Sequence, residues 1–309
     1  MTAHPFEVVV VGNAGLDTCV YVEGEELDLT REGHFTRNRD GVGQAGGYAS
    51  RGYARLGHRT AFLGAVGEDA AGAQVRAVLE REGVDVGATF PDPQGTARSV
   101  NFVFPDGRRR NFYDGRGHMT LTPDPAACRR VLAGARLAHF NLPNWARLVL
   151  PVAREEGVAI ACDVQDVSDP LDPYRRDFVE AADYLFFSAA HQPDPELLMR
   201  AYWTLNPRLV MVAGMGQRGC ALGVNGELRV FPPPPLPWPV LDTNGAGDAL
   251  AVGFLSGHVF GGLSLEEAVW RGQIAARHTC AQRVPKEDLI TAGRLGEVAA
   301  SLNACQTAP

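Results

Sequence analysis

Short apolar runs separated by helix-compatible segments constrain the fold of this chain more than any other feature. The run in Glu7–Gly12 is rich in valine and ends in glycine, and Thr60–Val66 repeats the pattern. Continuous β-branched runs are typical of strands that are buried on both faces, as in a parallel sheet. Each run is followed by a helix-compatible segment, Tyr48–Leu56 and Asp69–Glu82, that is closed by a glycine. This strand–helix–strand–helix order indicates an α/β layered fold.

The alternation returns in the second half of the chain. Further apolar runs predict strands at 137–141, 158–163, 184–187 and 209–213. Residues 219–231 predict a hairpin that turns at the Asn-Gly pair at 225–226, because this pair favours tight turns between antiparallel strands. The proline-rich segment 232–237 predicts an exposed, extended connection. No linker is visible, so we expect a single domain over residues 1–309.

Two other segments mix polar and apolar residues without a helical period. Residues 97–114 alternate around an Asp-Gly pair at 106–107, which predicts a hairpin. Residues 14–39 also have an antiparallel pattern. We therefore expect a small β sheet, built from about 14–40 and 96–116, that stands outside the α/β core.

Charge and composition exclude several classes of protein. The chain has 309 residues, 45% of them hydrophobic, which is enough for a substantial core. The net charge of -7 offers no general attraction for nucleic acid or anionic lipid, so we expect neither partner. The sequence has no apolar run of about 18 residues, and its start lacks a signal-peptide pattern, which predicts a cytoplasmic protein without a membrane anchor.

Cysteine and lysine usage narrows the chemistry further. The six cysteines are dispersed without Cys-x-x-Cys pairs, so we expect buried thiols rather than disulfides or a structural zinc. Lys286 is the only lysine. A P-loop protein and a protein kinase each need a lysine within a motif that this chain lacks. A pyridoxal enzyme would depend on Lys286, which stands in the polar segment Arg283–Asp288.

The segment Leu241–Asp248 carries the most chemical information. Gly245, Ala246 and Gly247 have almost no side chain, and they stand at the predicted start of a helix. Backbone N–H groups in such a turn can bind an anion. Asp248 would lie beside that anion and could accept the proton of a hydroxyl that attacks phosphorus. The residues alone leave open whether Asp248 is this base or only caps the helix.

The sequence Asp-Thr-Asn-Gly-Ala-Gly-Asp at 242–248 resembles the C-terminal signature of the ribokinase-like (PfkB) carbohydrate kinases. The resemblance extends over nearly the whole chain. It implies a three-layer fold with a central, mostly parallel sheet and a β lid, and a homodimer that forms through the lids. It also implies transfer of a phosphoryl group from ATP to a hydroxyl of a sugar-like molecule, with Asp248 as the general base.

Two motifs in the first half resemble the family's sugar-binding elements. Val10–Asp17 resembles the first strand, whose Asp grips sugar hydroxyls, and Gly43–Gly57 resembles the N-terminal signature. When the signature is aligned without gaps, Gly43 and Gln44 stand where the family has a pair of glycines, and Tyr48 stands where it has a sugar-binding Asn. Asn141 stands where ribokinase has a Glu at a strand end that contacts the sugar. The substrate-binding candidates are Asp17, Gly43, Gln44, Tyr48 and Asn141. The residues also allow an Asx turn at Asp17 and a plain core aromatic at Tyr48.

Residues of the second half resemble the family's nucleotide site. Val212–Gly219 is similar to the nucleotide turn, and 270–277 is similar to the helix that borders the adenine. A plain turn from strand to hairpin would use the same glycines. The nucleotide-binding candidates implied by the resemblance are Gly216, Arg218, Gly219, Thr243, Gly272, Gln273 and Ala276.

The expected cations have no complete motif. The Asn-x-x-Glu pattern that organises magnesium in many relatives is replaced by Ser-Ala-Ala-His at 188–191. The resemblance implies magnesium, whose ligands stay unassigned beyond the phosphates, water and Asp163. Asp242 and Thr243 match the potassium-binding family members, but the loop after the 270–277 helix does not, so a potassium requirement stays open.

Other functions compete with a sugar kinase. The family includes nucleoside kinases, and a non-catalytic sugar or nucleotide sensor on the same fold would explain why expected positions are altered. A dinucleotide oxidoreductase is suggested only by Gly12–Gly15, which lacks the Gly-x-Gly-x-x-Gly spacing. Arg108–Arg110 could meet an anionic substrate, but we expect a solvated lid strand on which alternate side chains face opposite ways.

Overall fold

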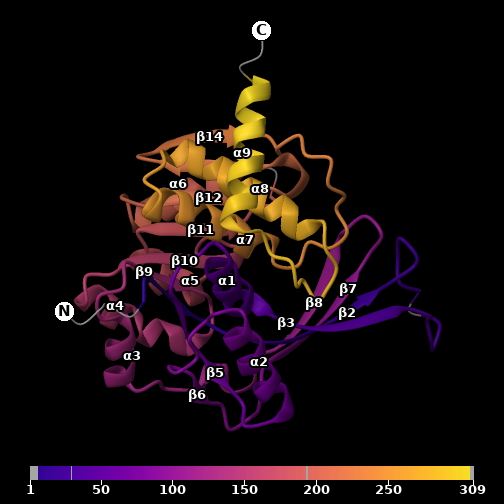
Figure 1. Cartoon of the computed structure of the whole chain (residues 1–309), viewed down its shortest axis with the longest axis horizontal. Coiled ribbons are helices and arrows are strands. Elements are labelled where there is room, and N and C mark those ends of the chain that lie inside the picture. Colours follow the sequence, from indigo (N-terminus) through magenta and orange to yellow (C-terminus); the bar gives the residue numbers. More distant parts are fainter. Residues whose placement is uncertain (1–5, 29, 193, 307–309) are drawn as a thin grey trace.

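An eight-stranded sheet forms the centre of the molecule (Figure 1). The computed structural model describes residues 6–28, 30–192 and 194–306. The strands of this sheet are β1 (Val8–Val11), β4 (Thr60–Leu63), β9 (Leu137–Phe140), β10 (Ala159–Asp166), β11 (Tyr184–Ser188), β12 (Val210–Gly214), β13 (Cys220–Val224) and β14 (Glu227–Phe231). Their order is β14-β13-β12-β11-β10-β9-β1-β4, and only the pairs that involve β13 are antiparallel. The predicted α/β class with a mostly parallel sheet is therefore confirmed.

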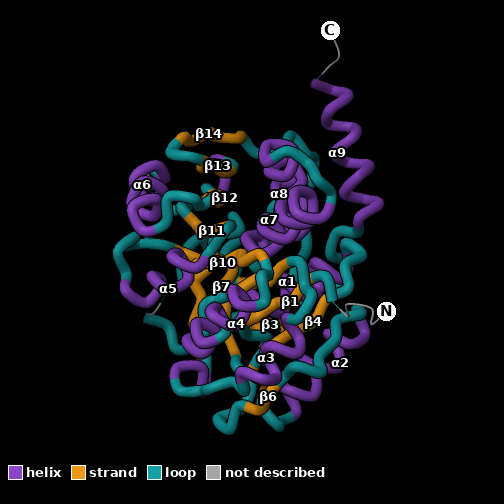
Figure 2. Tube along the Cα trace, turned by 90° about the vertical axis from the view of Figure 1, so that its left-hand side faces the viewer, coloured by secondary structure: helices purple, strands orange, loops and turns teal. Residues whose placement is uncertain are grey.

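Helices cover both faces of this sheet, as the two side views show (Figures 1 and 2). One face packs against α3 (Pro125–Leu132), α4 (Leu150–Glu155), α5 (Pro173–Ala181) and α6 (Pro195–Leu205). The other face packs against α1 (Gln44–Arg55), α2 (Ala70–Arg81), α7 (Ala246–Leu255), α8 (Leu265–Cys280) and α9 (Ala292–Gln306). These layers are the predicted three-layer arrangement.

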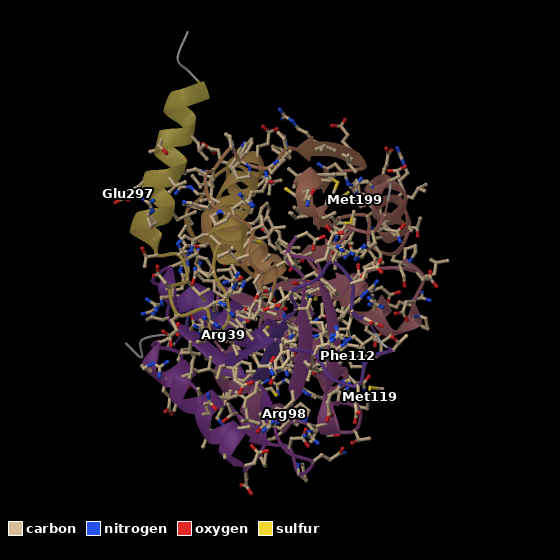
Figure 3. All side chains as sticks on the ribbon, turned by 90° about the vertical axis from the view of Figure 1, so that its right-hand side faces the viewer. Arg39, Arg98, Phe112, Met119, Met199 and Glu297 are labelled. Carbon is tan, nitrogen blue, oxygen red and sulfur yellow. The ribbon has the colours of Figure 1, made fainter. Side chains whose placement is uncertain are left out.

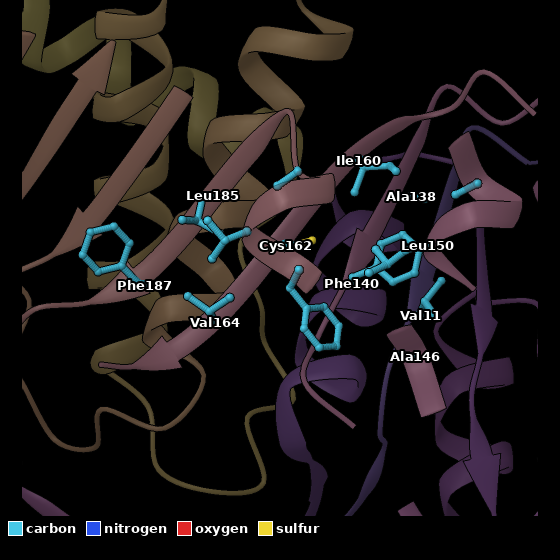
Figure 4. Close-up of a cluster of buried hydrophobic side chains, with 14 of the residues drawn as sticks. Val11, Ala138, Phe140, Ala146, Leu150, Ile160, Cys162, Val164, Leu185 and Phe187 are labelled. Atoms are coloured by element: carbon cyan, nitrogen blue, oxygen red, sulfur yellow. The ribbon is translucent and has the colours of Figure 1, made fainter. Parts of the chain in front are cut away.

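The central strands are apolar throughout because each face of the sheet has its own core. Val9 and Val11 belong to the core under α3–α6, whereas Val8 and Val10 belong to the core under α1, α7 and α8. Figure 4 shows the first core, with Val11 near Phe140 and Leu150. Burying one such side chain contributes about 1.5–3 kcal/mol, so a polar residue in these runs would be costly on either face.

A second sheet of four strands lies beside the main body and projects from it (Figure 1). Its strands are β2 (Gly15–Tyr21), β3 (Arg37–Gly43), β7 (Arg98–Val103) and β8 (Arg109–Asp114), in the order β3-β2-β7-β8. The two segments from which a separate β sheet is predicted supply these strands. A short parallel pair, β5 (Ala65–Val66) and β6 (Phe90–Pro91), lies near α2.

One helix begins earlier than the sequence predicts. Helix α1 starts at Gln44 rather than at Tyr48. Gly46 and Gly47 lower the helix propensity of this stretch, but the packing requires a small residue there. A Cβ atom at Gly46 would lie 2.6 Å from the backbone oxygen of Asn13. Tertiary contact therefore overrides local propensity at this helix start.

Several smaller expectations are also confirmed. The β13–β14 hairpin turns at Asn225 and Gly226, whose φ angles are 53° and 83°. Residues 232–237 have no regular structure and are mostly exposed. The five cysteines whose side chains are described are free and buried, and the side chain of Cys305 lies outside the described residues. In the part of the chain that the structure describes, no helix is long and apolar enough to cross a membrane.

Candidate active site

The start of α7 meets the inner face of the four-stranded sheet at the carboxyl edge of the main sheet. Open α/β sheets present ligands at this edge, because the parallel strands all end there. Asp163 comes from β10, Asp17 from β2 and Arg109 from β8, and all three lie close enough to act on the charge of Asp248 in α7. The fold therefore brings together charged residues that are far apart in the sequence.

The turn before α7 has the form of an anion-binding site. Gly245 precedes the helix with φ 74°, a left-handed conformation that favours glycine. A Cβ atom at Gly245 would lie 3.0 Å from the ring of Tyr48, whereas one at Gly247 would meet nothing within 4 Å. No side chain of the described residues caps this helix end. The N–H of Ala246, the first residue of α7, donates a hydrogen bond of 3.2 Å to the backbone oxygen of Thr243. The turn is open at Gly247, so the N–H groups that follow Ala246 in the first turn of α7 can receive an anion.

Asp248 stands in the first turn of α7 and is half-buried. Burial raises the pKa of its carboxyl well above the usual range, and the negative charges of Asp163 and Asp17 raise it further, while Arg109 opposes them. Burial likewise raises the pKa of Asp163, whose side chain accepts a hydrogen bond of 2.8 Å from the backbone N–H of Gln165. A carboxyl group with a raised pKa beside an anion site is suited to accept a proton near neutral pH.

Asp17 lies on the inner face of the four-stranded sheet. It is 4% exposed, and it accepts hydrogen bonds from the hydroxyl of Ser99 at 2.6 Å and from the backbone N–H of Gln44 at 3.1 Å. The register places Asp17 opposite Ser99 on β7, and Ser99 opposite Tyr113 on β8. Tyr113 accepts a hydrogen bond from the amide of Asn13 at the end of β1. The four-stranded sheet and the main sheet are thereby joined by polar side chains around Asp17.

Buried amide groups without a protein partner mark the same region. Both side-chain polar atoms of Gln44 and of Asn141 are buried and have no hydrogen-bond partner. Asn141 follows β9 and is 2% exposed, and a Cβ at Gly12 would lie 2.3 Å from its Oδ1 atom. Buried polar groups in proteins are nearly always hydrogen-bonded, so the unpaired amides of Gln44, which also binds Asp17 through its backbone N–H, and of Asn141 are available to a ligand with hydroxyl groups.

The backbone conformation of Gln44 also agrees with the ungapped alignment of the N-terminal motif. Its φ angle is 62°, a conformation that glycine adopts at little cost and other residues rarely adopt. This is expected if Gly43 and Gln44 stand where the family has two glycines. Gly43 contacts Asp17 so closely that a Cβ would lie 2.1 Å from its Oδ2 atom.

Tyr48 lies beneath the anion-binding turn. It is 6% exposed, and its ring contacts the backbone of Gly43 and Gly245. The ring therefore supports both the substrate side and the phosphate side of the site. This position explains how an aromatic residue fits there, while a direct contact between Tyr48 and a substrate stays a prediction.

Every residue of β8 is exposed, as expected for a solvated strand, but Arg109 also contacts the site. Its Nη1 donates a hydrogen bond of 3.0 Å to Oδ1 of Asn244, within the turn before α7. In the register of β7 and β8, Arg109 pairs with Val103 and Arg110 pairs with Phe102, so the two arginines face opposite ways. Arg109 faces the site and Arg110 faces outward. The alternation is as predicted, but the sequence could not tell which arginine would face the site.

The nucleotide-binding candidates Gly216, Arg218 and Gly219 lie at the turn after β12. Gly216 and Gly219 have φ angles of 59° and 90°, and a Cβ at Gly219 would lie 2.1 Å from the backbone oxygen of Phe231. Arg218 donates hydrogen bonds to the backbone oxygens of Ala189 and Gln192, at 3.2 and 2.6 Å. These contacts explain the two glycines structurally, so their contact with a nucleotide stays a prediction.

The nucleotide-binding candidates Gly272 and Gln273 on α8 are buried in the interior instead. A Cβ at Gly272 would lie 2.5 Å from the backbone oxygen of Leu250, so this glycine allows α8 to pack closely on α7. Gln273 is 5% exposed and donates to the backbone oxygen of Pro232 at 3.1 Å, while Ala276 is half-buried on α8. The structure therefore assigns packing contacts to Gly272 and Gln273, and it does not bring them to an open surface.

Thr243 connects the turn before α7 to the four-stranded sheet. Its hydroxyl donates a hydrogen bond of 3.0 Å to the backbone oxygen of Gly107, at the tip of the β7–β8 hairpin. Ser99 and Tyr113 were not candidates in the sequence, although the alternation of the hairpin could have placed them on one face. Nothing in the sequence signals the contact of Thr243 with Gly107, because it joins segments that are distant along the chain.

Comparison with known proteins identifies the class. The profile of the pfkB family of carbohydrate kinases matches residues 6–292. The chain therefore belongs to this family, and it is a sugar kinase, a phosphotransferase with an alcohol group as acceptor.

Relatives and solved structures agree with this family. Acarbose 7(IV)-phosphotransferase of Actinoplanes sp. is 32% identical over 283 residues, which cover 91% of this chain and 93% of the relative. The 5-dehydro-2-deoxygluconokinase of Geobacillus thermodenitrificans is 24% identical over 93% and 92% of the two chains. A microbiome-derived acarbose kinase has a TM-score of 0.87 at 27% identity, over 96% and 99% of the two chains. Ribokinase of Arabidopsis thaliana, complexed with ribose and ATP, has a TM-score of 0.77 at 21% identity and shares the fold.

Proposed function

We propose that this sugar kinase transfers the terminal phosphoryl group of ATP to a hydroxyl group of a sugar or sugar-like molecule. The carrying observation is the position of Asp248 in the first turn of α7, within electrostatic range of Asp17, whose hydrogen-bond partner Gln44 has a buried and unpartnered side-chain amide. Relatives named for acarbose and for 5-dehydro-2-deoxygluconate support a polyhydroxylated acceptor. A nucleoside is the alternative acceptor within the family, and it would present its ribose hydroxyls to the same cradle.

The mechanism follows from the geometry of the site. Asp17 and the amides of Gln44 and Asn141 hold and orient the hydroxyl groups of the acceptor. Asp248 accepts the proton of the attacking hydroxyl, and the N–H groups of the turn Gly245–Gly247 stabilise the charge of the phosphoryl group during transfer. Arg109 adds positive charge from the lid side. The nucleotide would lie along the turn after β12.

Magnesium is the expected companion of ATP, and the residues present fit it. In the described ranges, no group of three His, Cys, Asp or Glu side chains is placed to hold a metal. Mg²⁺ in such sites usually keeps water and phosphate ligands and takes only one or two carboxylates. Asp163, beside Asp248, would supply one carboxylate. When bound, the ion would neutralise charge on the phosphates.

The four-stranded sheet would act as a lid and as a dimer surface. Lid closure over the acceptor would exclude water, which otherwise competes for the phosphoryl group.

The outer face of the sheet exposes apolar side chains, with Phe112 60% and Val100 39% exposed (Figure 3 labels Phe112). We propose that a second copy covers this face. Light scattering that gives the mass of a monomer would contradict this dimer.

A panel of acceptors tests the proposed function. ADP release from ATP and magnesium is measured with acarbose, ribose, fructose, 5-dehydro-2-deoxygluconate and adenosine. We expect release that depends on one of the sugar-like acceptors. Binding of ATP without release for any acceptor would favour a sensor, and release with adenosine alone would favour the nucleoside kinase.

The pH profile should respond to Asp163. The raised pKa of Asp248 keeps the base protonated at low pH, so kcat/KM should rise with pH through that pKa. Asp163→Asn removes a negative charge that raises this pKa, so we expect the acid limb of the profile to move to lower pH. The profile is measured at saturating magnesium, because Asp163 also stands at the proposed metal site. An acid limb that stays in place would contradict the coupling between the two carboxyls.

Arg109 offers a prediction with a matched control on the same strand. Arg109→Met should lower kcat/KM by about 10- to 100-fold, because a hydrogen bond to a charged group contributes about 1.5–3 kcal/mol. Arg110→Met removes the same charge from the outward face and should leave the steady-state constants nearly unchanged. Equal effects of the two variants would show that only the net charge of the lid matters.

A further inference from the structure

The only lysine of the chain lies buried behind the anion-binding turn. The side chain of Lys286 has no exposed surface. Its Nζ donates hydrogen bonds to the backbone oxygens of Asp242 at 2.7 Å and Thr279 at 3.0 Å, and Oδ1 of Asp242 is 3.8 Å away. Burial lowers the pKa of the ammonium, whereas the carboxylate of Asp242 opposes this. A buried ammonium held by carbonyl and carboxylate oxygens has the surroundings of a dehydrated monovalent cation.

Of the residues that hold Lys286, Thr279 lies in α8 and Asp242 lies at the base of the anion-binding turn. The carboxylate of Asp242 accepts hydrogen bonds from the backbone N–H and the side-chain amide of Asn244, both at 2.8 Å. It also accepts one from the hydroxyl of Tyr21 at 2.6 Å. Asn244 directly precedes Gly245, whose left-handed conformation opens the turn. The position of the ammonium therefore fixes Asp242, and Asp242 fixes the start of the anion site.

A potassium ion from solution has no place between Asp242 and Thr279, because the ammonium of Lys286 binds both of their backbone oxygens. The elements that the family resemblance links to potassium are Asp242, Thr243 and the loop after α8, and Lys286 extends from that loop to Asp242. The ammonium already occupies the space between the backbone oxygens of Asp242 and Thr279. Without Lys286, these oxygens and a fully buried carboxylate would face one another without that positive charge, which is unfavourable in the interior.

We propose that Lys286 is a positioning residue whose ammonium acts as a built-in monovalent cation for the phosphate-binding turn, so that the enzyme does not need potassium. The effect on turnover rests on the proposed kinase function, whereas the effect on the turn itself does not. The lysine substitutes for an ion that would otherwise have to bind from solution.

The wild-type enzyme provides the first test. Turnover and the midpoint of thermal unfolding are compared in potassium chloride and in choline chloride at equal concentration. We expect the turnover in the two salts to agree within about twofold. We expect the midpoint of thermal unfolding to be the same in both salts. Activation of the wild type by potassium of more than about tenfold would overturn the proposal, whatever the variants do.

Two substitutions separate the charge of Lys286 from the space it fills. Lys286→Ala removes the charge and leaves room for an ion, whereas Lys286→Met removes the charge and fills most of the space. In choline chloride we expect both variants to lose turnover by about 10- to 100-fold, the usual effect of removing a group that orients a site. Potassium should restore turnover and raise the unfolding midpoint of Lys286→Ala, but not of Lys286→Met.

A second buried cation, which packs on the same loop without contacting the oxygens that hold the ammonium, serves as the control. Arg51 has a side chain only 3% exposed, pairs with Glu82 at 2.9 Å and donates a hydrogen bond of 2.5 Å to the backbone oxygen of Lys286. Arg51→Ala should lower the unfolding midpoint equally in both salts. Equal behaviour of Lys286→Ala in the two salts, or equal rescue of Lys286→Met, would overturn the proposal. If no acceptor is phosphorylated by the wild type in either salt, the kinase proposal fails, and the unfolding midpoints still decide the role of Lys286.

Discussion

Asp248→Asn is expected to lower kcat by about 10²- to 10⁴-fold, because it removes the base that accepts the proton of the attacking hydroxyl. The N–H groups of Gly245–Gly247 are unchanged in this variant, so binding of ATP should persist. The raised pKa of Asp248 means that the ionised carboxylate is costly in the folded protein. The variant should therefore unfold at the same temperature as the wild type or at a higher one.

Steady-state kinetics, nucleotide binding by calorimetry and thermal unfolding together check this expectation. Asp288→Asn is the control, because this carboxylate is exposed on the surface. A variant that turns over at a near-normal rate would remove Asp248 from the role of base. Loss of turnover together with a lower unfolding temperature would instead indicate that Asp248 supports the helix start.

Asp17→Ala is expected to lower kcat/KM for the sugar by about 10²- to 10³-fold while the KM for ATP stays nearly constant. Asp17 is a buried acceptor of hydrogen bonds, and hydrogen bonds to a charged group contribute about 1.5–3 kcal/mol each. The expected loss corresponds to two hydroxyl groups of the sugar that no longer have the carboxylate of Asp17 as a hydrogen-bond partner. Burial raises the pKa of Asp17, and the hydrogen bond from Ser99 opposes this.

The matched control lies on the neighbouring strand. Asp40→Ala removes an exposed carboxylate from β3 that accepts a hydrogen bond of 2.6 Å from the hydroxyl of Thr18. Thr18 and Asp17 are adjacent on β2 and so face opposite sides of the lid. Asp40→Ala should leave both KM values unchanged. A rise of the KM for ATP in Asp17→Ala would place this carboxylate on the nucleotide side instead.

The class of the fold is evident from the sequence because the central strands are apolar on both faces. Runs such as Val8–Val11 leave few alternatives to a buried parallel sheet, and the structure confirms the α/β class. The hairpin at Asn225 and Gly226 is equally local, since the φ angles that it needs are those that Asn and Gly tolerate. Local chemistry determines such features, so they can be predicted.

Helix α1 shows where local chemistry misleads. Gly46 and Gly47 argue against a helix, but the backbone of Asn13 packs so closely on Gly46 that a larger residue would not fit. Gly272 is a similar case, because its small size serves the contact between α7 and α8. The reason for each glycine lies in a distant segment of the chain.

The sequence by itself determined the layered fold and the glycine-rich turn that starts α7 with Asp248, because each depends on residues that are close together in the chain. Only the tertiary structure decided that Arg109 faces the site and that Lys286 lies buried against Asp242. Segment 283–288 is mostly polar, and only Val284 and Lys286 of it are buried. The burial of Lys286 depends on oxygens of Asp242 and Thr279, which come together only when the chain folds.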